Sequence, residues 1–101
     1  GFTSSATAEG ATANGAYSIA SGANSTANGI SADATGVDST AVGENAQASG
    51  DQSSAFGSDA NASGQSSTAI GDNADSSGAY STAVGANSTA SGIDSTAVGE
   101  N

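Results

Sequence analysis

The 101-residue sequence contains no lysine, arginine, histidine or cysteine. Without His or Lys a serine hydroxyl lacks its ordinary general base, and without Cys the chain has no thiolate nucleophile. Without Arg or Lys it has no cation to contact phosphate, and its formal net charge of −10 repels nucleic acid. The composition therefore predicts that the protein is not an enzyme, has no catalytic residues, needs no cofactor and does not bind nucleic acid.

Large apolar side chains are also scarce, because the chain has no Leu, Met or Trp and its Val, Ile and Phe residues number ten. No apolar run is long enough for a signal peptide or a membrane span, so if the parent protein is exported this chain is a piece of it. A chain with so few large apolar residues and so much net charge is normally disordered. The spacing of its glycines argues against disorder here.

Thirteen glycines follow one another at intervals of seven residues, from Gly15 to Gly99. Disordered low-complexity sequence has no reason to hold one residue type to a fixed spacing over twelve consecutive heptads. Regular repetition of a short unit is typical of solenoids, in which each unit stacks on its neighbours. The spacing therefore predicts a single repeat domain over residues 1–101.

Two other positions of the heptad are almost as regular as the glycine. With glycine at position a, position d is always Ser or Ala, and position f is Ala in every heptad except that of Ser76. Residues two apart in an extended strand share a face, so one face of every strand carries only small side chains. Position g alternates between a large apolar residue and Ser, as in Val42, Ser49, Phe56 and Ser63, so the full repeat is fourteen residues.

Each fourteen-residue unit is predicted to form two short strands and two tight corners. Glycine tolerates positive φ, and the Asn and Asp residues that often follow it form turns. Parallel stacking at about 4.8 Å per unit predicts a rod about 34 Å long from roughly seven units.

Other periodic folds do not fit. In a coiled coil thirteen glycines would cost roughly 13 kcal/mol relative to alanine, collagen needs glycine at every third residue, and the calcium-binding roll has a period of nine. No metal site is therefore expected.

The large apolar residues of position g form one line along the predicted rod, which we call the apolar stripe: Val42, Phe56, Ile70, Val84 and Val98. Threonines on the same face of these strands would lie beside it: Thr40, Thr68, Thr82 and Thr96. Covering the stripe would contribute about 1.5–3 kcal/mol for each side chain. A continuous apolar patch on a polar rod is typical of an interface, so we expect the chain to self-associate there.

The repeats around the stripe resemble the head domain of YadA-like trimeric autotransporter adhesins, which repeat a fourteen-residue unit around the pattern Asn-Ser-Val-Ala-Ile-Gly. The matching stretches are residues 38–43, 52–57, 66–71, 80–85 and 94–99. The first apolar position of the family pattern is Thr or Ser here. The resemblance implies an all-β, left-handed parallel β-roll assembled as a homotrimer around the Val/Ile face. It also implies display on the outer membrane of a Gram-negative bacterium, through a stalk and a C-terminal anchor that this sequence lacks.

One segment departs from the regular alternation. Residues 17–20 match residues 80–83, yet the two stretches lie nine heptads apart, an odd number. We therefore expect a local irregularity at residues 29–36, where the phase of the repeat would change.

The leading functional hypothesis is a non-enzymatic adhesion module that binds host extracellular matrix proteins, the host cell surface or like fibres. The alternative is a rigid spacer without a ligand of its own, and a third hypothesis, prompted by the regular threonines, is ice binding. The sequence does not assign ligand-binding residues. The candidate surface groups are Asp51, Asp59, Asp72, Asp75, Asp94, Tyr17 and Tyr80.

Overall fold

The computed structural model describes residues 2–100, which form fourteen short β-strands and no helix. This part of the chain therefore has no helix that could cross a membrane. The odd-numbered strands have two residues each and form one sheet, the odd sheet: β1 (Ser5–Ala6), β3 (Ile19–Ala20), β5 (Asp33–Ala34), β7 (Gln47–Ala48), β9 (Asn61–Ala62), β11 (Asp75–Ser76) and β13 (Thr89–Ala90). The even-numbered strands have three residues each and form the even sheet: β2 (Thr12–Asn14), β4 (Thr26–Asn28), β6 (Thr40–Val42), β8 (Ser54–Phe56), β10 (Thr68–Ile70), β12 (Thr82–Val84) and β14 (Thr96–Val98).

Every strand pairs in parallel with the strand two further along the chain. The register advances by fourteen residues at each step, as in the series Ala27, Ala41 and Ala55 of the even sheet. We call each fourteen-residue turn of the solenoid a coil. The molecule measures 34 × 20 × 11 Å, so the predicted rod length of about 34 Å is confirmed.

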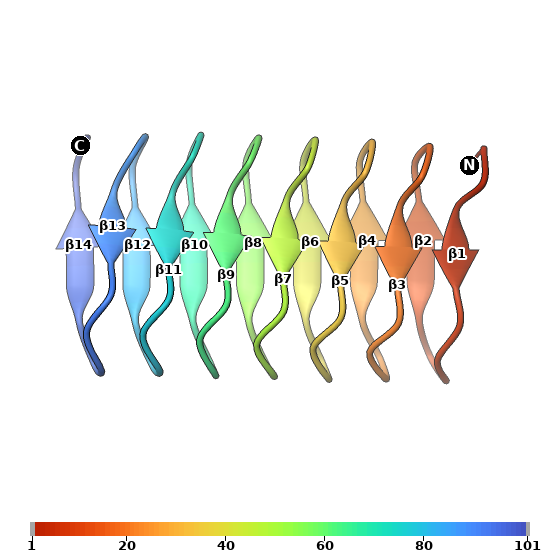
Figure 1. Cartoon of the computed structure of the whole chain (residues 1–101), viewed down its shortest axis with the longest axis horizontal. Helices are drawn as coiled ribbons and strands as arrows, with labels where there is room; N and C mark the ends of the chain where they lie inside the picture. The colour runs from red at the N-terminus through yellow and green to blue at the C-terminus, as the bar shows by residue number, and fades with distance from the viewer. Residues whose placement is uncertain (1, 101) are drawn as a thin grey trace.

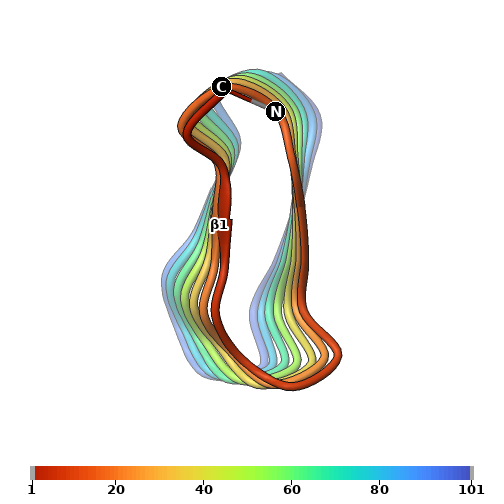
Figure 2. The same ribbon diagram turned by 90° about the vertical axis from the view of Figure 1, so that its right-hand side faces the viewer.

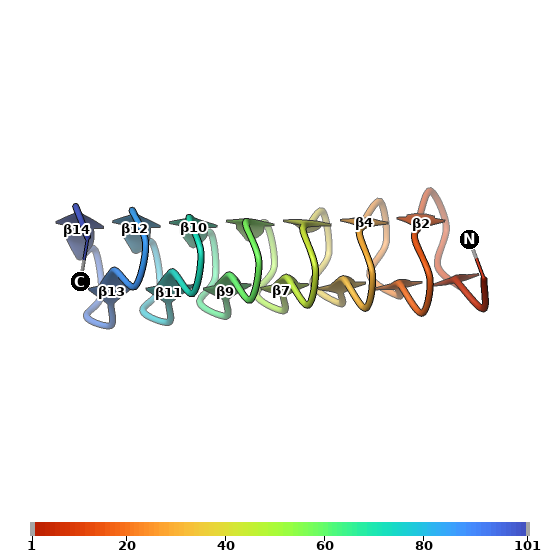
Figure 3. The same ribbon diagram turned by 90° about the horizontal axis from the view of Figure 1, so that it is seen from above.

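The solenoid is left-handed, as the family resemblance implies. In Figure 1 the odd strands lie in front and run downward, the even strands lie behind and run upward, and the chain advances from right to left. Seen from its N-terminal end in Figure 2, the chain therefore turns anticlockwise as it recedes. Figure 3 shows the two sheets as separate thin layers along the rod.

The space between the two sheets is filled by small side chains, as the heptad pattern predicts. Inward-facing alanines such as Ala41, Ala48 and Ala55 are completely buried, and the largest side chains that are fully buried are serines. Some of these serines bond to the backbone, since Ser39 Oγ donates to the Gly36 carbonyl at 2.7 Å. An interior this narrow admits no branched aliphatic side chain, so the larger apolar residues must point outward.

The corners differ in detail from the prediction. Among residues 2–100, positive φ occurs at every position c, two residues after position a, and the non-glycine residues there have φ between 52° and 62°. The glycines at position a have positive φ only at the corners that follow even strands, for example Gly71 with φ 130°. At the other corners a side chain is excluded by the next coil, because a Cβ on Gly64 would overlap the carbonyl of Gly78. The glycine period therefore reflects close contact between coils as well as turn conformation.

The irregularity expected at residues 29–36 is absent. Ala34 pairs with Ala20 on one side and with Ala48 on the other, so the register stays at fourteen through this segment. The prediction was wrong because it used outward-facing residues to define the phase. Both sheets require only small inward side chains, so Ile19 can lie on the odd sheet although the residue matching it in sequence, Thr82, lies on the even sheet.

Candidate self-association surface

The outward face of the even sheet carries two continuous columns of side chains on either side of the buried alanines. The first, the threonine column, is Thr12, Thr26, Thr40, Ser54, Thr68, Thr82 and Thr96. The second contains the apolar stripe and runs Asn14, Asn28, Val42, Phe56, Ile70, Val84 and Val98. Because the strands are in register, these residues are aligned along the rod.

The apolar stripe is partly open to solvent in the single chain. The exposed fraction is 39% for Phe56, 42% for Ile70 and 76% for Val98, whereas Val42 and Val84 are half-buried. Each residue is covered in part by its neighbours in the adjacent coils, but no other segment of residues 2–100 packs over the face, since each strand contacts only its near neighbours along the rod. A continuous apolar line of this kind is typical of a surface that another molecule covers.

The threonine column offers hydrogen-bonding groups beside the stripe. Thr40, Thr68 and Thr82 are half-buried and Thr96 is exposed. Within residues 2–100 none of their four hydroxyls bonds to a protein group, so all remain available to water or to a second molecule. A covered hydroxyl needs a partner, so an interface on this face must supply one.

The opposite face of the rod is polar. The outward residues of the odd sheet include Asp33, Gln47, Asn61 and Asp75, and the Asn61 amide donates to Asp75 Oδ1 at 3.5 Å. Desolvation by burial raises the pKa of the Asp33 carboxyl above its usual value, and one of its oxygens is buried without a hydrogen-bond partner. The only large apolar residue in this column is Ile19, so the two faces of the rod differ in character.

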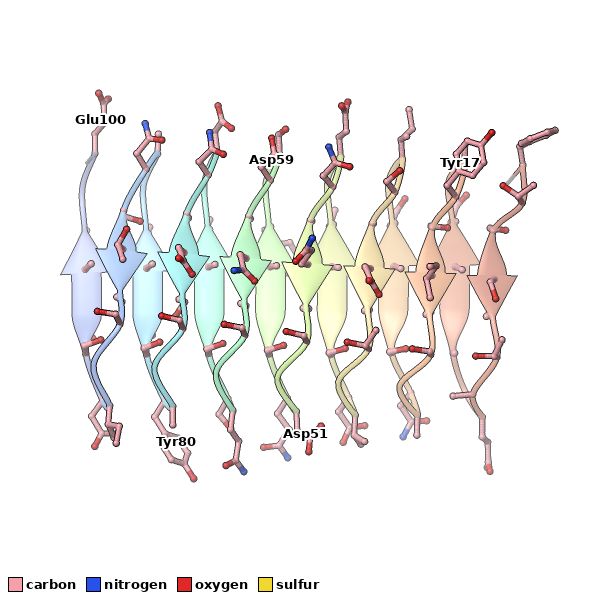
Figure 4. All side chains as sticks on the ribbon, viewed as in Figure 1. Tyr17, Asp51, Asp59, Tyr80 and Glu100 are labelled. Carbon is pink, nitrogen blue, oxygen red and sulfur yellow. The ribbon has the colours of Figure 1, made fainter. Side chains whose placement is uncertain are left out.

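The candidate ligand-binding residues do not converge on one site. In Figure 4, Tyr17 and Asp59 lie at one edge of the rod, and Asp51 and Tyr80 lie at the opposite edge. The Asp51 carboxylate accepts a hydrogen bond from the Val37 amide of the preceding coil at 3.0 Å, which gives it a structural role.

The other three candidates occupy different kinds of structural position. Asp75 is a strand residue of the odd sheet, Asp72 accepts a hydrogen bond from its neighbour Asn73, and Asp94 is a corner residue of the last coil.

One contact was missed by the sequence reasoning. The rings of Phe2 and Tyr17 meet edge to face with centroids 5.9 Å apart. Their separation of fifteen residues places them in adjacent coils at neighbouring corner positions, which is the signal that would have predicted the pair.

An open depression of about 520 Å³ lies beside the last coil and is lined by residues 87–89 and 96–100. Among residues 2–100 no group of three or more acidic side chains is placed to hold a metal ion.

The fold and this face define the class of protein: a parallel β-solenoid repeat protein with an unpartnered apolar face. The family model of the YadA head domain repeat matches residues 13–32, 34–60, 48–74, 62–88 and 76–101. The chain belongs to the YadA head family. This family forms part of the trimeric autotransporter adhesins, which are outer-membrane virulence proteins of the bacterial cell surface. No curated protein matches the sequence.

Proposed function

We propose that the chain is one adhesion domain that assembles as a homotrimer through the apolar stripe and the threonine column of the even sheet. The observation that carries the proposal is the uninterrupted alignment of five large apolar side chains along one face of the rod. Val42 and Val84 are already half-buried and gain less from cover than Phe56 and Ile70, so assembly is worth several kcal/mol per chain. Family membership supports three as the number of chains.

A charge in the stripe tests this assembly. Ile70→Asp would place three carboxylates in one covered layer, where burial of unpaired charge is strongly unfavourable. We expect the variant to sediment as a monomer at concentrations where the unmodified chain is a trimer. Asn61→Asp adds the same charge to the odd sheet and is the matched control, which should remain trimeric. An unmodified chain that stays a folded monomer at high concentration would exclude the proposed interface.

We further propose that the assembled rod binds host extracellular matrix proteins, the host cell surface or like fibres. Its outer surface repeats the same corners and strands in every coil, so many weak contacts can add to a useful avidity. Purified protein should bind immobilised collagen, fibronectin or laminin, and measurement at two salt concentrations reports the share of electrostatic attraction. The monomeric Ile70→Asp variant should lose most of that binding. Failure of the trimer to bind all three ligands would contradict the host-matrix proposal.

Display of this domain on the bacterial outer membrane, through a stalk and anchor outside this sequence, completes the proposal. The family supports it, because trimeric autotransporter adhesins are outer-membrane proteins of the cell surface.

The alternative proposal is a rigid spacer, which the uniformity of the coils favours. Removing two whole coils from the parent protein would shorten the rod by about 10 Å without changing its surface. A spacer should tolerate this deletion with little loss of adhesion per molecule, whereas an adhesive rod should lose binding in proportion to the coils removed.

Ice binding is disfavoured because the threonine column lies directly beside the apolar stripe, on the face that we assign to assembly. Thermal hysteresis of the purified chain tests this hypothesis.

A further inference from the structure

A stripe made of similar layers does not by itself define how two copies align. Successive layers of the even sheet are about 4.8 Å apart, and a slip of one coil brings Val84 of one copy opposite Val98 of another. Four of the five apolar layers then still face an apolar layer. The threonine column offers no better reference, because six of its seven members are threonine.

The column that contains the stripe changes from polar to apolar residues at one point. Its first two members are Asn14 and Asn28, and the next is Val42. Both asparagines are exposed in the single chain, and neither side-chain amide bonds to another group within residues 2–100. They occupy the same outward position in their coils as Val42 does in the next, so any molecule that covers the stripe along the whole rod covers them as well.

We propose that Asn14 and Asn28 fix the alignment of copies in the assembly. This inference rests on the proposed self-association through the stripe. In the aligned assembly, asparagines of equal number meet in one layer, and each amide offers two N–H donors and a carbonyl acceptor that its equivalents can satisfy. In an assembly slipped by one coil, Asn28 faces Val42 of a neighbour and its amide is buried without a partner.

The change from Asn28 to Val42 along the column therefore makes the aligned arrangement more stable than a slipped one. A buried amide without a partner lowers the population of an arrangement about ten- to a hundredfold. Phe56 adds a difference in size, but an apolar side chain that faces another apolar side chain leaves no polar group unpaired. A single polar layer in an apolar seam sets register in coiled coils by the same principle. The same change in the column also selects which chains can assemble together. A chain with asparagines in other coils would bury unpaired amides against valine in a mixed assembly.

The test moves one asparagine without changing the composition of the column. The double variant Asn28→Val/Val98→Asn has the same number of polar layers, now at the first and last coils. Mixed with the unmodified chain, it opposes Asn to Val in two layers of every mixed trimer. Unmodified chain labelled with ¹⁵N is unfolded and refolded together with the unlabelled variant, and native mass spectrometry measures mixed and unmixed trimers.

We expect each protein to form trimers alone, and mixed trimers to be depleted at least about tenfold relative to random assortment. The control variant Gln47→Val/Asn61→Val changes two amides on the odd sheet and should mix at random. Random mixing of the Asn28→Val/Val98→Asn variant would overturn the inference while leaving the stripe interface intact. Absence of trimers for the unmodified chain would instead contradict the proposed assembly. A second exchange, Asn14→Val/Val98→Asn, gives the same test if the first variant does not form trimers of its own.

Discussion

From Gly15 to Gly85, the α-carbon of the glycine that opens the heptad lies against the backbone of the next coil. At Gly71 a Cβ would approach the Gly85 carbonyl group to 2.7 Å, and at Gly64 it would overlap the carbonyl of Gly78. These contacts involve backbone on both sides, so no side-chain movement can relieve them. The spacing of the coils is therefore set at the glycines.

Gly64→Ala should accordingly destabilise the chain by at least about 2 kcal/mol, because the coils on either side must separate locally. Urea unfolding followed by circular dichroism measures the change. Gln65→Ala alters the adjacent exposed corner residue and should change the free energy of unfolding by less than about 0.5 kcal/mol. Equal stability of the two variants would show that the coils have room for a methyl group.

Because of the Asp33 carboxyl, the free energy of unfolding should decrease as the pH rises from acidic to neutral values. Burial raises its pKa above the usual value of 3.8, so the folded state binds a proton more tightly than the unfolded state does. The charged form therefore opposes folding at neutral pH, and this penalty disappears as the pH falls below the pKa of the unfolded chain. Asp33→Asn should raise the melting temperature at pH 7 and have little effect at pH 3. Asp75→Asn, in the same column, is the control and should not show the gain at pH 7.

Among the structural elements, the strands are held by backbone ladders, and their inward serines are not equivalent. Ser81 Oγ donates to the Gly78 carbonyl at 2.6 Å and accepts from Ser76 Oγ at 2.6 Å, since its own proton is already used. Ser67 occupies the same heptad position, yet its buried hydroxyl has no partner within the described residues.

Replacing these two serines should therefore have opposite effects. Ser81→Ala leaves Ser76 unpaired in the interior and should cost about 1–3 kcal/mol. Ser67→Ala removes an unpaired buried hydroxyl and should leave stability unchanged or raise it by up to about 1 kcal/mol. The free energies of unfolding in urea measure both effects, and a similar loss for both variants would contradict the assignment of hydrogen bonds.

The inward residues of the strands allowed most of the fold to be predicted from the sequence. Ala41 and Ala55 at position f are buried and in register, as the spacing indicates, because only small side chains fit between the sheets. The stripe was predicted for the same reason, since Val42 and Phe56 could not point inward. Its role as an interface stays a prediction.

Outward residues and corners were less predictable. The placement of Ile19 on the odd sheet could not be deduced, because outward residues do not determine the phase. Positive φ at Gln52 and Tyr80 follows from the closure of the coil and not from their side chains, so residue preference gave no indication of it.

At the scale of the whole molecule, two outward residues lie in the same column of the same sheet when they are a multiple of fourteen residues apart in the sequence. Deleting residues 57–70 joins Phe56 to Gly71 and removes one coil, with the remaining stripe on one face. Deleting residues 57–63 joins Phe56 to Gly64, which places Ile70, Val84 and Val98 on the odd sheet.

Both deletions should leave a β-rich solenoid by circular dichroism, because the inward residues of the two sheets are equally small. Only the fourteen-residue deletion should sediment as a trimer, since the seven-residue deletion divides the stripe between opposite faces. Trimers from the seven-residue deletion would show that assembly does not require a continuous stripe.

Each strand of the rod contacts only strands of its own coil and of the coils next to it. A pull on the two ends therefore loads the coils in series, so that they can unwind one at a time. Release of fourteen residues lengthens the chain by about 45 Å, roughly nine times the height of the coil that is lost. Such a rod should yield to tension in small equal steps and rewind when the load falls, which single-molecule stretching of the purified chain would measure.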